Sequence, residues 1–240
     1  MVPLNDNNPT RNRPVIVYAL IAINVLVFFH QYQLQLADQR LPVLAQQAGF
    51  SYMSEFFQSW AVIPRELNDN LGREWITLIS SQFLHGGVLH LAGNMLYLWV
   101  FGNNIEDKLG RVRFVLFYIG CGMLAALTQS FFSPANSPIP IIGASGAIAG
   151  VMGAYIIRFP KAEILTILPI LFYVTAIRIP AVYFLGIWFV QQAIFSFLSL
   201  GGPSNVSEGG VAYWAHAAGF VFGIILAPPL GLFDDDYQRR

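Results

Sequence analysis

The sequence predicts an all-α polytopic membrane protein with six transmembrane helices, because it is apolar, poor in charge and rich in long apolar runs. Of 240 residues, 55% are hydrophobic and only 11% are charged, whereas soluble domains carry about 25% charged residues. The mean hydropathy is +0.55. A span needs roughly 20 apolar residues, and we expect helices near 14–30, 83–102, 113–132, 141–157, 180–198 and 211–232.

Charge balance and cysteine content exclude other classes of protein. The basic and acidic residues number 13 each, and the formal net charge is zero, so no basic surface for nucleic acid is expected. The single Cys121 rules out an intramolecular disulfide framework. No small-residue cleavage site follows the first apolar run, which favours a retained first span over a removable signal peptide.

One transmembrane domain is expected at 14–232, with an outer loop at 31–80 and cytoplasmic tails at 1–13 and 233–240. Cytoplasmic flanks of membrane proteins collect Lys and Arg. With the N-terminus inside, ten basic residues lie inside and three outside. This predicts cytoplasmic termini. We expect the protein in the cell (inner) membrane. The inner residues are Arg11, Arg13, Lys108, Arg111, Arg113, Arg158, Lys161, Arg178, Arg239 and Arg240, and the outer ones are Arg40, Arg65 and Arg73.

The segment 163–177 is apolar, but its fifteen residues are few for a span and include Pro169. It is rich in β-branched and aromatic residues, so we expect a buried or interfacial segment on the cytoplasmic side. If it crossed the membrane, every later helix would reverse its direction.

Polar side chains in three of the predicted spans are candidates for function, because such groups are costly in lipid. His90 and Asn94 are four residues apart and share a helix face. Ser145 lies in the first turn of the fourth span, and His216 lies near the start of the sixth. These spans all run inward from an outer loop, so we expect the side chains at one depth in the outer half of the bilayer.

Small residues line one side of the fourth span and one side of the sixth. Such stripes let helix backbones approach closely in lipid. A close crossing could bring Ser145 within hydrogen-bond reach of His216. The stripes are Gly143, Gly146, Gly150 and Gly153 in the fourth span, and Ala212, His216, Gly219 and Gly223 in the sixth.

A serine beside a histidine permits nucleophilic catalysis. A neutral imidazole can take the proton of the Ser145 hydroxyl, and the resulting oxyanion needs fixed donors. His90, Asn94 and the amide of Ser145 can supply them. No Asp or Glu lies in the outer half of any predicted span, so a dyad is expected, with His216 oriented by packing.

Each residue also has a structural explanation. A lone transmembrane serine usually bonds a carbonyl of its own helix, and a lone histidine is often a structural hydrogen-bonding group. A metal site fits poorly, because His85 and His90 are five residues apart and no HExxH motif occurs. His85 is expected to be a cap or a loop anchor.

Three motifs resemble the rhomboid family of intramembrane serine proteases: FLHGGVLHLAGN at 83–94, GASGAIAGVMGA at 143–154 and AHAAGFVFG at 215–223. The resemblance implies a six-helix rhomboid bundle that needs no cofactor and cleaves membrane-anchored proteins near the outer face of the bilayer. Ser145 then resembles the nucleophile, His216 the general base, and His90 with Asn94 the oxyanion stabilisers.

The resemblance also covers three supporting positions. Gly143 and Gly219 match glycines that flank or pack against the site, and Trp188 resembles a residue near a lateral gate for substrate. Ala149 stands where some members place an aromatic ring against the histidine.

Two alternatives remain at the level of sequence. One is a non-catalytic rhomboid-like protein that escorts or retains membrane clients, which usually lacks the serine or the histidine; both are kept here. The other is a transporter or channel, but no buried charge pairs along several spans are visible.

Overall fold

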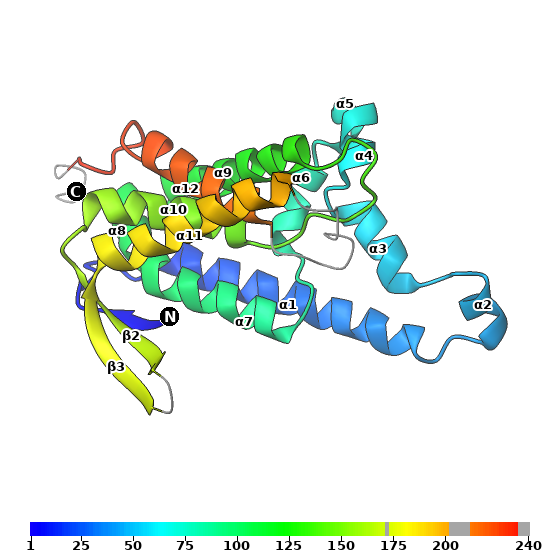
Figure 1. Cartoon of the computed structure of the whole chain (residues 1–240), viewed down its shortest axis with the longest axis horizontal. Coiled ribbons are helices and arrows are strands. Elements are labelled where there is room, and N and C mark those ends of the chain that lie inside the picture. The colour runs from blue at the N-terminus through cyan, green and yellow to red at the C-terminus, as the bar shows by residue number, and fades with distance from the viewer. Residues whose placement is uncertain (171–172, 202–211, 235–240) are drawn as a thin grey trace.

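The computed structural model of the protein describes residues 1–170, 173–201 and 212–234. This part of the chain is mostly helical, and the longer helices lie along one common direction (Figure 1). A small sheet lies at the end of the bundle that also holds the N-terminus. Short helices of the outer connection lie at the opposite end.

Three helices are long and apolar enough to cross a membrane, within the part of the chain that the structure describes: α1 (Val15–Asp38), α9 (Arg111–Phe132) and α11 (Ala181–Gly201). Two shorter apolar helices are α10 (Ser145–Arg158) and α12 (Tyr213–Leu226). The second predicted span is a composite of α7 (Val88–Tyr97), a π-helical segment η2 (Leu98–Gly102) and α8 (Asn103–Leu109). Each predicted span therefore contains helix in the described residues. Within these residues, only three of the six contain one helix that is long enough to cross a membrane by itself.

Several predicted boundaries were wrong. Helix α1 continues to Asp38, eight residues beyond its predicted end, because glutamine and leucine extend a helix readily. Helix α7 begins at Val88, after Gly87, and not at residue 83. Helix α10 begins at Ser145, and not at residue 141, because Gly143 has a positive φ of 118° that breaks the helical path. Residue 211, the predicted start of the sixth span, lies outside the described residues. Arg239 and Arg240, which were counted among the inner basic residues, also lie outside them.

The outer connection is largely helical. It contains α2 (Val43–Gln47), α3 (Tyr52–Trp60), α4 (Pro64–Asp69), α5 (Leu71–Glu74), α6 (Thr77–Ser80) and a 3₁₀ turn η1 (Ser81–Phe83). The Asp38 carboxylate accepts hydrogen bonds from the amides of Tyr52 and Met53, which fixes α3 to the end of α1. Reciprocal backbone bonds between Val62 and Ile141 tie the connection to the segment before α10.

The all-α prediction requires a correction, because the chain contains a three-stranded antiparallel sheet. Its order is β1 (Val2–Asp6), β2 (Glu163–Ile170) and β3 (Tyr173–Pro180). The β-branched residues that made 163–177 a poor span favour extended backbone. Residues 2–6 of the predicted polar tail pair with β2, because this pairing satisfies backbone groups of both segments.

Side chains of α8 and α10 hold the N-terminal segment at this end of the bundle. The Glu106 carboxylate accepts hydrogen bonds from the amides of Ile16 at 3.0 Å and Val17 at 2.8 Å, which caps the start of α1. Asp6 accepts hydrogen bonds from the Tyr155 hydroxyl and from the Asn104 amide group.

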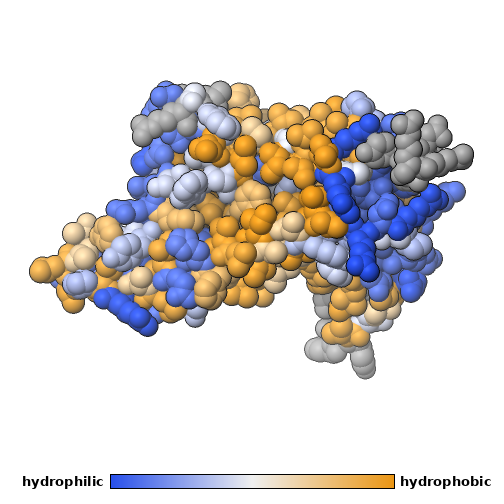
Figure 2. All heavy atoms as spheres, turned by 180° about the vertical axis from the view of Figure 1, so that it is seen from behind, coloured by the Kyte–Doolittle hydropathy of each residue, from blue (hydrophilic) through white to orange (hydrophobic). Residues whose placement is uncertain are grey.

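Apolar side chains gather over the middle of the bundle, and hydrophilic residues lie toward both ends (Figure 2). Leu26 of α1, Leu116 of α9 and Phe197 of α11 are among the exposed apolar residues. In water such a surface would be unfavourable. Its position fits a protein surrounded by lipid at mid-height.

Helices α10 and α12 cross with their backbones in contact. A Cβ atom added to Gly223 would lie 1.9 Å from the carbonyl oxygen of Gly150, and one added to Gly153 would lie 2.0 Å from that of Phe220. On its other side, Gly150 faces Cys121 of α9, where an added Cβ would lie 2.6 Å from the cysteine Cβ. The two predicted small-residue stripes therefore meet each other, and α9 packs behind them.

This crossing predicts a strong difference between two glycine substitutions. Gly223→Ala should destabilise the protein by about 1–3 kcal/mol or more, because the methyl group overlaps backbone that cannot move aside. Gly120→Ala in α9 should be neutral or slightly stabilising, since nothing lies within 4 Å of its added Cβ and alanine favours helix. Thermal unfolding in detergent micelles measures both. Equal stability of the two variants would contradict the close crossing.

Candidate active site

Ser145 and His216 form a direct hydrogen bond between two helices. The Ser145 Oγ lies 2.8 Å from Nε2 of His216, although the residues are 71 positions apart. Ser145 is the first residue of α10, and His216 lies in the first turn of α12. This contact joins a hydroxyl to a ring nitrogen that can accept its proton.

The glycine contacts between the two helices explain why the side chains meet. Gly146 directly follows Ser145, and Gly219 lies one turn after His216. A Cβ atom on Gly219 would lie 2.2 Å from the carbonyl oxygen of Gly146. Any side chain at position 219 would therefore overlap the α10 backbone, so glycine at this position permits the close crossing that sets the short separation of serine and histidine.

Gly143 shapes the turn that leads into α10. Its φ of 118° lies in the region that favours glycine. Its amide donates a hydrogen bond of 2.9 Å to the carbonyl oxygen of Ser81, at the end of the outer connection. The first turn of α10, and with it Ser145, is therefore attached to the same end of the bundle as the outer connection.

His90 and Asn94 point toward the space beside Gly143. A Cβ atom on Gly143 would lie 2.9 Å from His90 Nε2 and 3.7 Å from Asn94 Nδ2. Asn94 Nδ2 is buried and has no acceptor among the described residues. The Gly86 amide donates to His90 Nδ1 at 3.3 Å, so a neutral ring carries its proton on Nε2. His90 Nε2 and Asn94 Nδ2 are thus two donors that lie beside Gly143, which precedes Ser145 by two residues.

His85 anchors the segment before α7 through its backbone. Gln31 of α1 donates from Nε2 to the His85 carbonyl oxygen and accepts from the His85 amide, both at 3.0 Å. The buried His85 ring lies edge-on to the His90 ring, with centroids 5.0 Å apart. Its position agrees with the expected loop anchor.

Helix α11 supplies two side-chain contacts to the His216 ring. The Trp188 ring lies 5.9 Å from the imidazole, centroid to centroid. Gln192 Oε1 lies 2.8 Å from His216 Nδ1. Ala149 is buried against Gly219, with an added Cβ on the glycine 3.3 Å from the alanine Cβ, so α10 brings no aromatic ring to the histidine.

Gln192 was not among the site residues predicted from the sequence. One signal was available, because Gln192 follows Trp188 by four residues and therefore shares its helix face. A glutamine in an apolar span is also a functional candidate, because burying a polar side chain without a partner is unfavourable.

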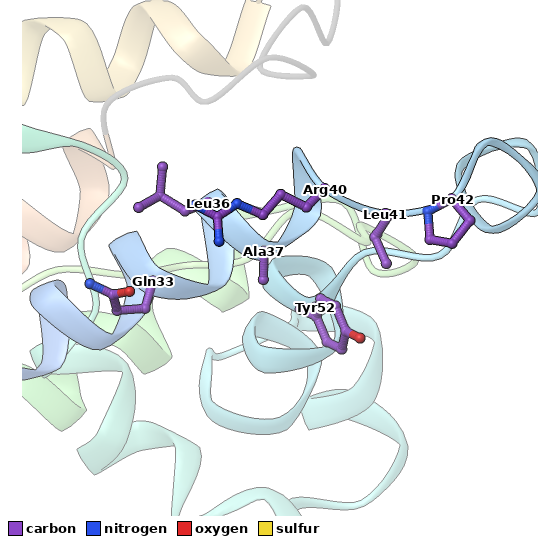
Figure 3. A pocket seen from close by; sticks show the side chains of 7 residues that line it. All are labelled: Gln33, Leu36, Ala37, Arg40, Leu41, Pro42 and Tyr52. Carbon is purple, nitrogen blue, oxygen red and sulfur yellow. The ribbon is translucent and has the colours of Figure 1, made fainter.

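A separate pocket of about 410 Å³ lies between the end of α1, the turn that follows it and the start of α3 (Figure 3). Leu36, Ala37 and Arg40 come from α1 and its end, whereas Tyr52 comes from α3. None of its lining residues belongs to the Ser145–His216 site.

Comparison with known proteins identifies the family. The Rhomboid domain family matches residues 72–232, more than half of the chain. The chain belongs to the rhomboid family. The match includes all three motifs singled out in the sequence, and it begins near the end of the outer connection.

Named relatives have similar sequences over part of their length. Rhomboid protease GluP of Bacillus subtilis is 32% identical over 142 residues, which cover 59% of this chain and 24% of the relative. Rhomboid protein 1, mitochondrial, of Saccharomyces cerevisiae is 28% identical over 213 residues, covering 88% of this chain and 51% of the relative. Presenilin-associated rhomboid-like protein A, mitochondrial, of Danio rerio is 32% identical over 98 residues, covering 40% of this chain and 26% of the relative. The chain thus spans about a quarter to a half of the length of these relatives.

The short distance from Gly143 to His90 predicts the effect of adding a side chain at position 143. Gly143→Ala should strongly reduce labelling of the chain by a fluorophosphonate probe, because the methyl group meets the His90 ring at 2.9 Å and the φ of 118° becomes strained.

Gly87→Ala is the matched control, since Gly87 has extended backbone and no atom of the described residues lies within 4 Å of its added Cβ. Labelling rates of the two purified variants in detergent provide the measurement. Unchanged labelling of Gly143→Ala would show that the space beside the glycine is not used.

Proposed function

We propose that this chain is an intramembrane serine endopeptidase that cleaves transmembrane protein substrates near the outer face of the bilayer. The hydrogen bond of 2.8 Å between Ser145 Oγ and His216 Nε2 carries the proposal. Membership of the rhomboid family and the similarity to the rhomboid protease GluP support it.

In the proposed reaction, His216 is the general base and Ser145 is the nucleophile. As Oγ attacks the carbonyl carbon of the scissile bond, its proton passes to His216 Nε2. The same proton then leaves with the amine product, and an acyl group stays on the serine. Water, activated by His216, hydrolyses this ester and regenerates the hydroxyl.

The oxyanion of each tetrahedral intermediate needs donors that are fixed before the reaction. We assign this role to His90 Nε2, Asn94 Nδ2 and the amide of Ser145. The two side-chain donors are 2.9 and 3.7 Å from one point beside Gly143. The amide belongs to the first turn of a helix, where amides have no partner within the helix.

We propose six transmembrane segments with both termini cytoplasmic, in the cell membrane. The bias of Lys and Arg supports this orientation. In addition, the N-terminal strand and the start of α11 lie at one end of the bundle, whereas the outer connection lies at the other (Figure 1). The site adjoins the outer connection through the bond from Gly143 to Ser81, which fits cleavage near the outer face.

Substrates of this proposed enzyme are transmembrane proteins, and we propose that a substrate helix enters beside Trp188 of α11. No metal or other cofactor takes part in the proposed reaction. Trp188 lies against both His216 and Phe220 of α12, so displacement of α11 would open this side.

Replacing the nucleophile tests the proposal. Ser145→Ala should abolish cleavage of a test transmembrane substrate reconstituted in liposomes, because an alanine methyl group cannot form the acyl intermediate. Ser199→Ala should cleave at the wild-type rate, since the Ser199 hydroxyl bonds a carbonyl of its own helix. Cleavage is followed by gel mobility of the labelled substrate.

Undiminished cleavage by Ser145→Ala would exclude this nucleophile. A wild-type protein that binds the substrate without cutting it, and does not react with fluorophosphonate, would instead favour the non-catalytic rhomboid-like binder.

Loss of one oxyanion donor should have a smaller effect. Asn94→Ala should lower kcat by about 100-fold, the usual effect of removing one such donor. Asn24→Ala is the control, because Asn24 is a buried asparagine whose amide bonds the Leu20 carbonyl of its own helix. Steady-state kinetics with the same substrate measure both, and a normal kcat in Asn94→Ala would remove this residue from the mechanism.

A further inference from the structure

His216 has a polar contact at each ring nitrogen, and the contact at Nδ1 decides what Nε2 can do. Nε2 lies 2.8 Å from Ser145 Oγ, and Nδ1 lies 2.8 Å from Gln192 Oε1. A neutral imidazole carries one proton. For Nε2 to accept the serine proton, the ring proton must reside on Nδ1, where it needs an acceptor.

The side-chain carbonyl of Gln192 meets this requirement. An amide oxygen accepts hydrogen bonds and cannot donate them, so its contact with Nδ1 selects the tautomer that leaves Nε2 free to accept. Gln192 is only 7% exposed. In such a buried position, water is poorly placed to replace the amide.

The packing of α11 against α12 fixes the position of this amide. Phe189 stacks on Phe220 with ring centroids 4.8 Å apart, and Phe195 packs on Tyr213 at 5.1 Å. These aromatic contacts lie on either side of Gln192 along α11. The glutamine backbone is therefore held at a set distance from His216, and its side-chain oxygen reaches Nδ1 at 2.8 Å.

We propose that Gln192 is the positioning residue of the dyad: its amide oxygen holds the His216 proton on Nδ1 and directs Nε2 toward Ser145. This inference rests on the proposed serine protease function. In soluble serine proteases a buried aspartate has this task. A carboxylate within the membrane is costly, whereas an amide selects the same tautomer without introducing a charge.

The first test removes the acceptor and keeps the side-chain length. Gln192→Met should lower kcat about 10- to 100-fold, the effect commonly seen when a metal-bound histidine loses the hydrogen bond that orients its ring. KM should stay unchanged, because Gln192 contacts the histidine and has no assigned contact with substrate. The rate of fluorophosphonate labelling should fall by a similar factor.

The second test replaces the amide by a carboxylate. Gln192→Glu keeps an acceptor at Nδ1, so activity should persist. The negative charge favours the protonated imidazole, and the acidic limb of the pH–rate profile should therefore move to higher pH. Loss of packing alone would not shift this limb.

Ser196→Ala is the matched control. Ser196 lies one turn after Gln192, is 1% exposed, and bonds the Gln192 backbone carbonyl at 2.8 Å. It should retain the wild-type kcat and pH profile. Thermal unfolding in detergent shows whether each variant is folded. If Gln192→Met does not fold, the pH–rate profile of Gln192→Glu tests the role of Gln192.

The outcomes separate the two proposals. A wild-type kcat in folded Gln192→Met, or an unshifted acidic limb in Gln192→Glu, would overturn the role of Gln192. If Ser145→Ala is inactive in the same assay, the proposed Ser145–His216 dyad still stands. An active Ser145→Ala would overturn the proposed function itself.

Discussion

The backbone contact between α10 and α12 is the constraint on which the rest of the site depends. Gly146 and Gly150 of α10 meet Gly219 and Gly223 of α12 so closely that an added methyl group would overlap a carbonyl oxygen. In lipid, helix association gains little from the hydrophobic effect and depends on close packing. The same packing holds a serine and a histidine from distant parts of the chain at hydrogen-bond distance.

Around this crossing, other helices place polar side chains next to Ser145 and His216, whereas lipid tails have no polar groups. Helix α7 contributes His90 and Asn94, and α11 contributes Gln192 to the second nitrogen of the histidine. Unpaired polar groups are unfavourable in an apolar environment. Among the residues that the structure describes, Asn94 Nδ2 has no hydrogen-bond partner, and a donor without a partner is what an oxyanion would require.

Much of this arrangement could be predicted from the sequence, and the failures have physical causes. The glycine spacings predicted a close crossing near Ser145 and His216, because helical periodicity places those positions on one face. The π-helical segment Leu98–Gly102 and the continuation of α1 to Asp38, which delays the start of the outer connection, could not be predicted in this way. The strands at 163–180 were missed as strands, because a short apolar run does not by itself distinguish a strand from another buried segment. One of the pairings, between β2 and residues 2–6, also joins segments distant in sequence.

The sequence by itself determined the membrane setting, the family motifs and the faces on which Ser145, His216, His90 and Asn94 lie. These follow from hydropathy and from the helical repeat, which are local properties of the chain. Only the tertiary structure decided that Gln192 reaches His216 and that residues 2–6 join a sheet. Such contacts depend on how separate elements are rotated and shifted against one another, and no local pattern of residues specifies that.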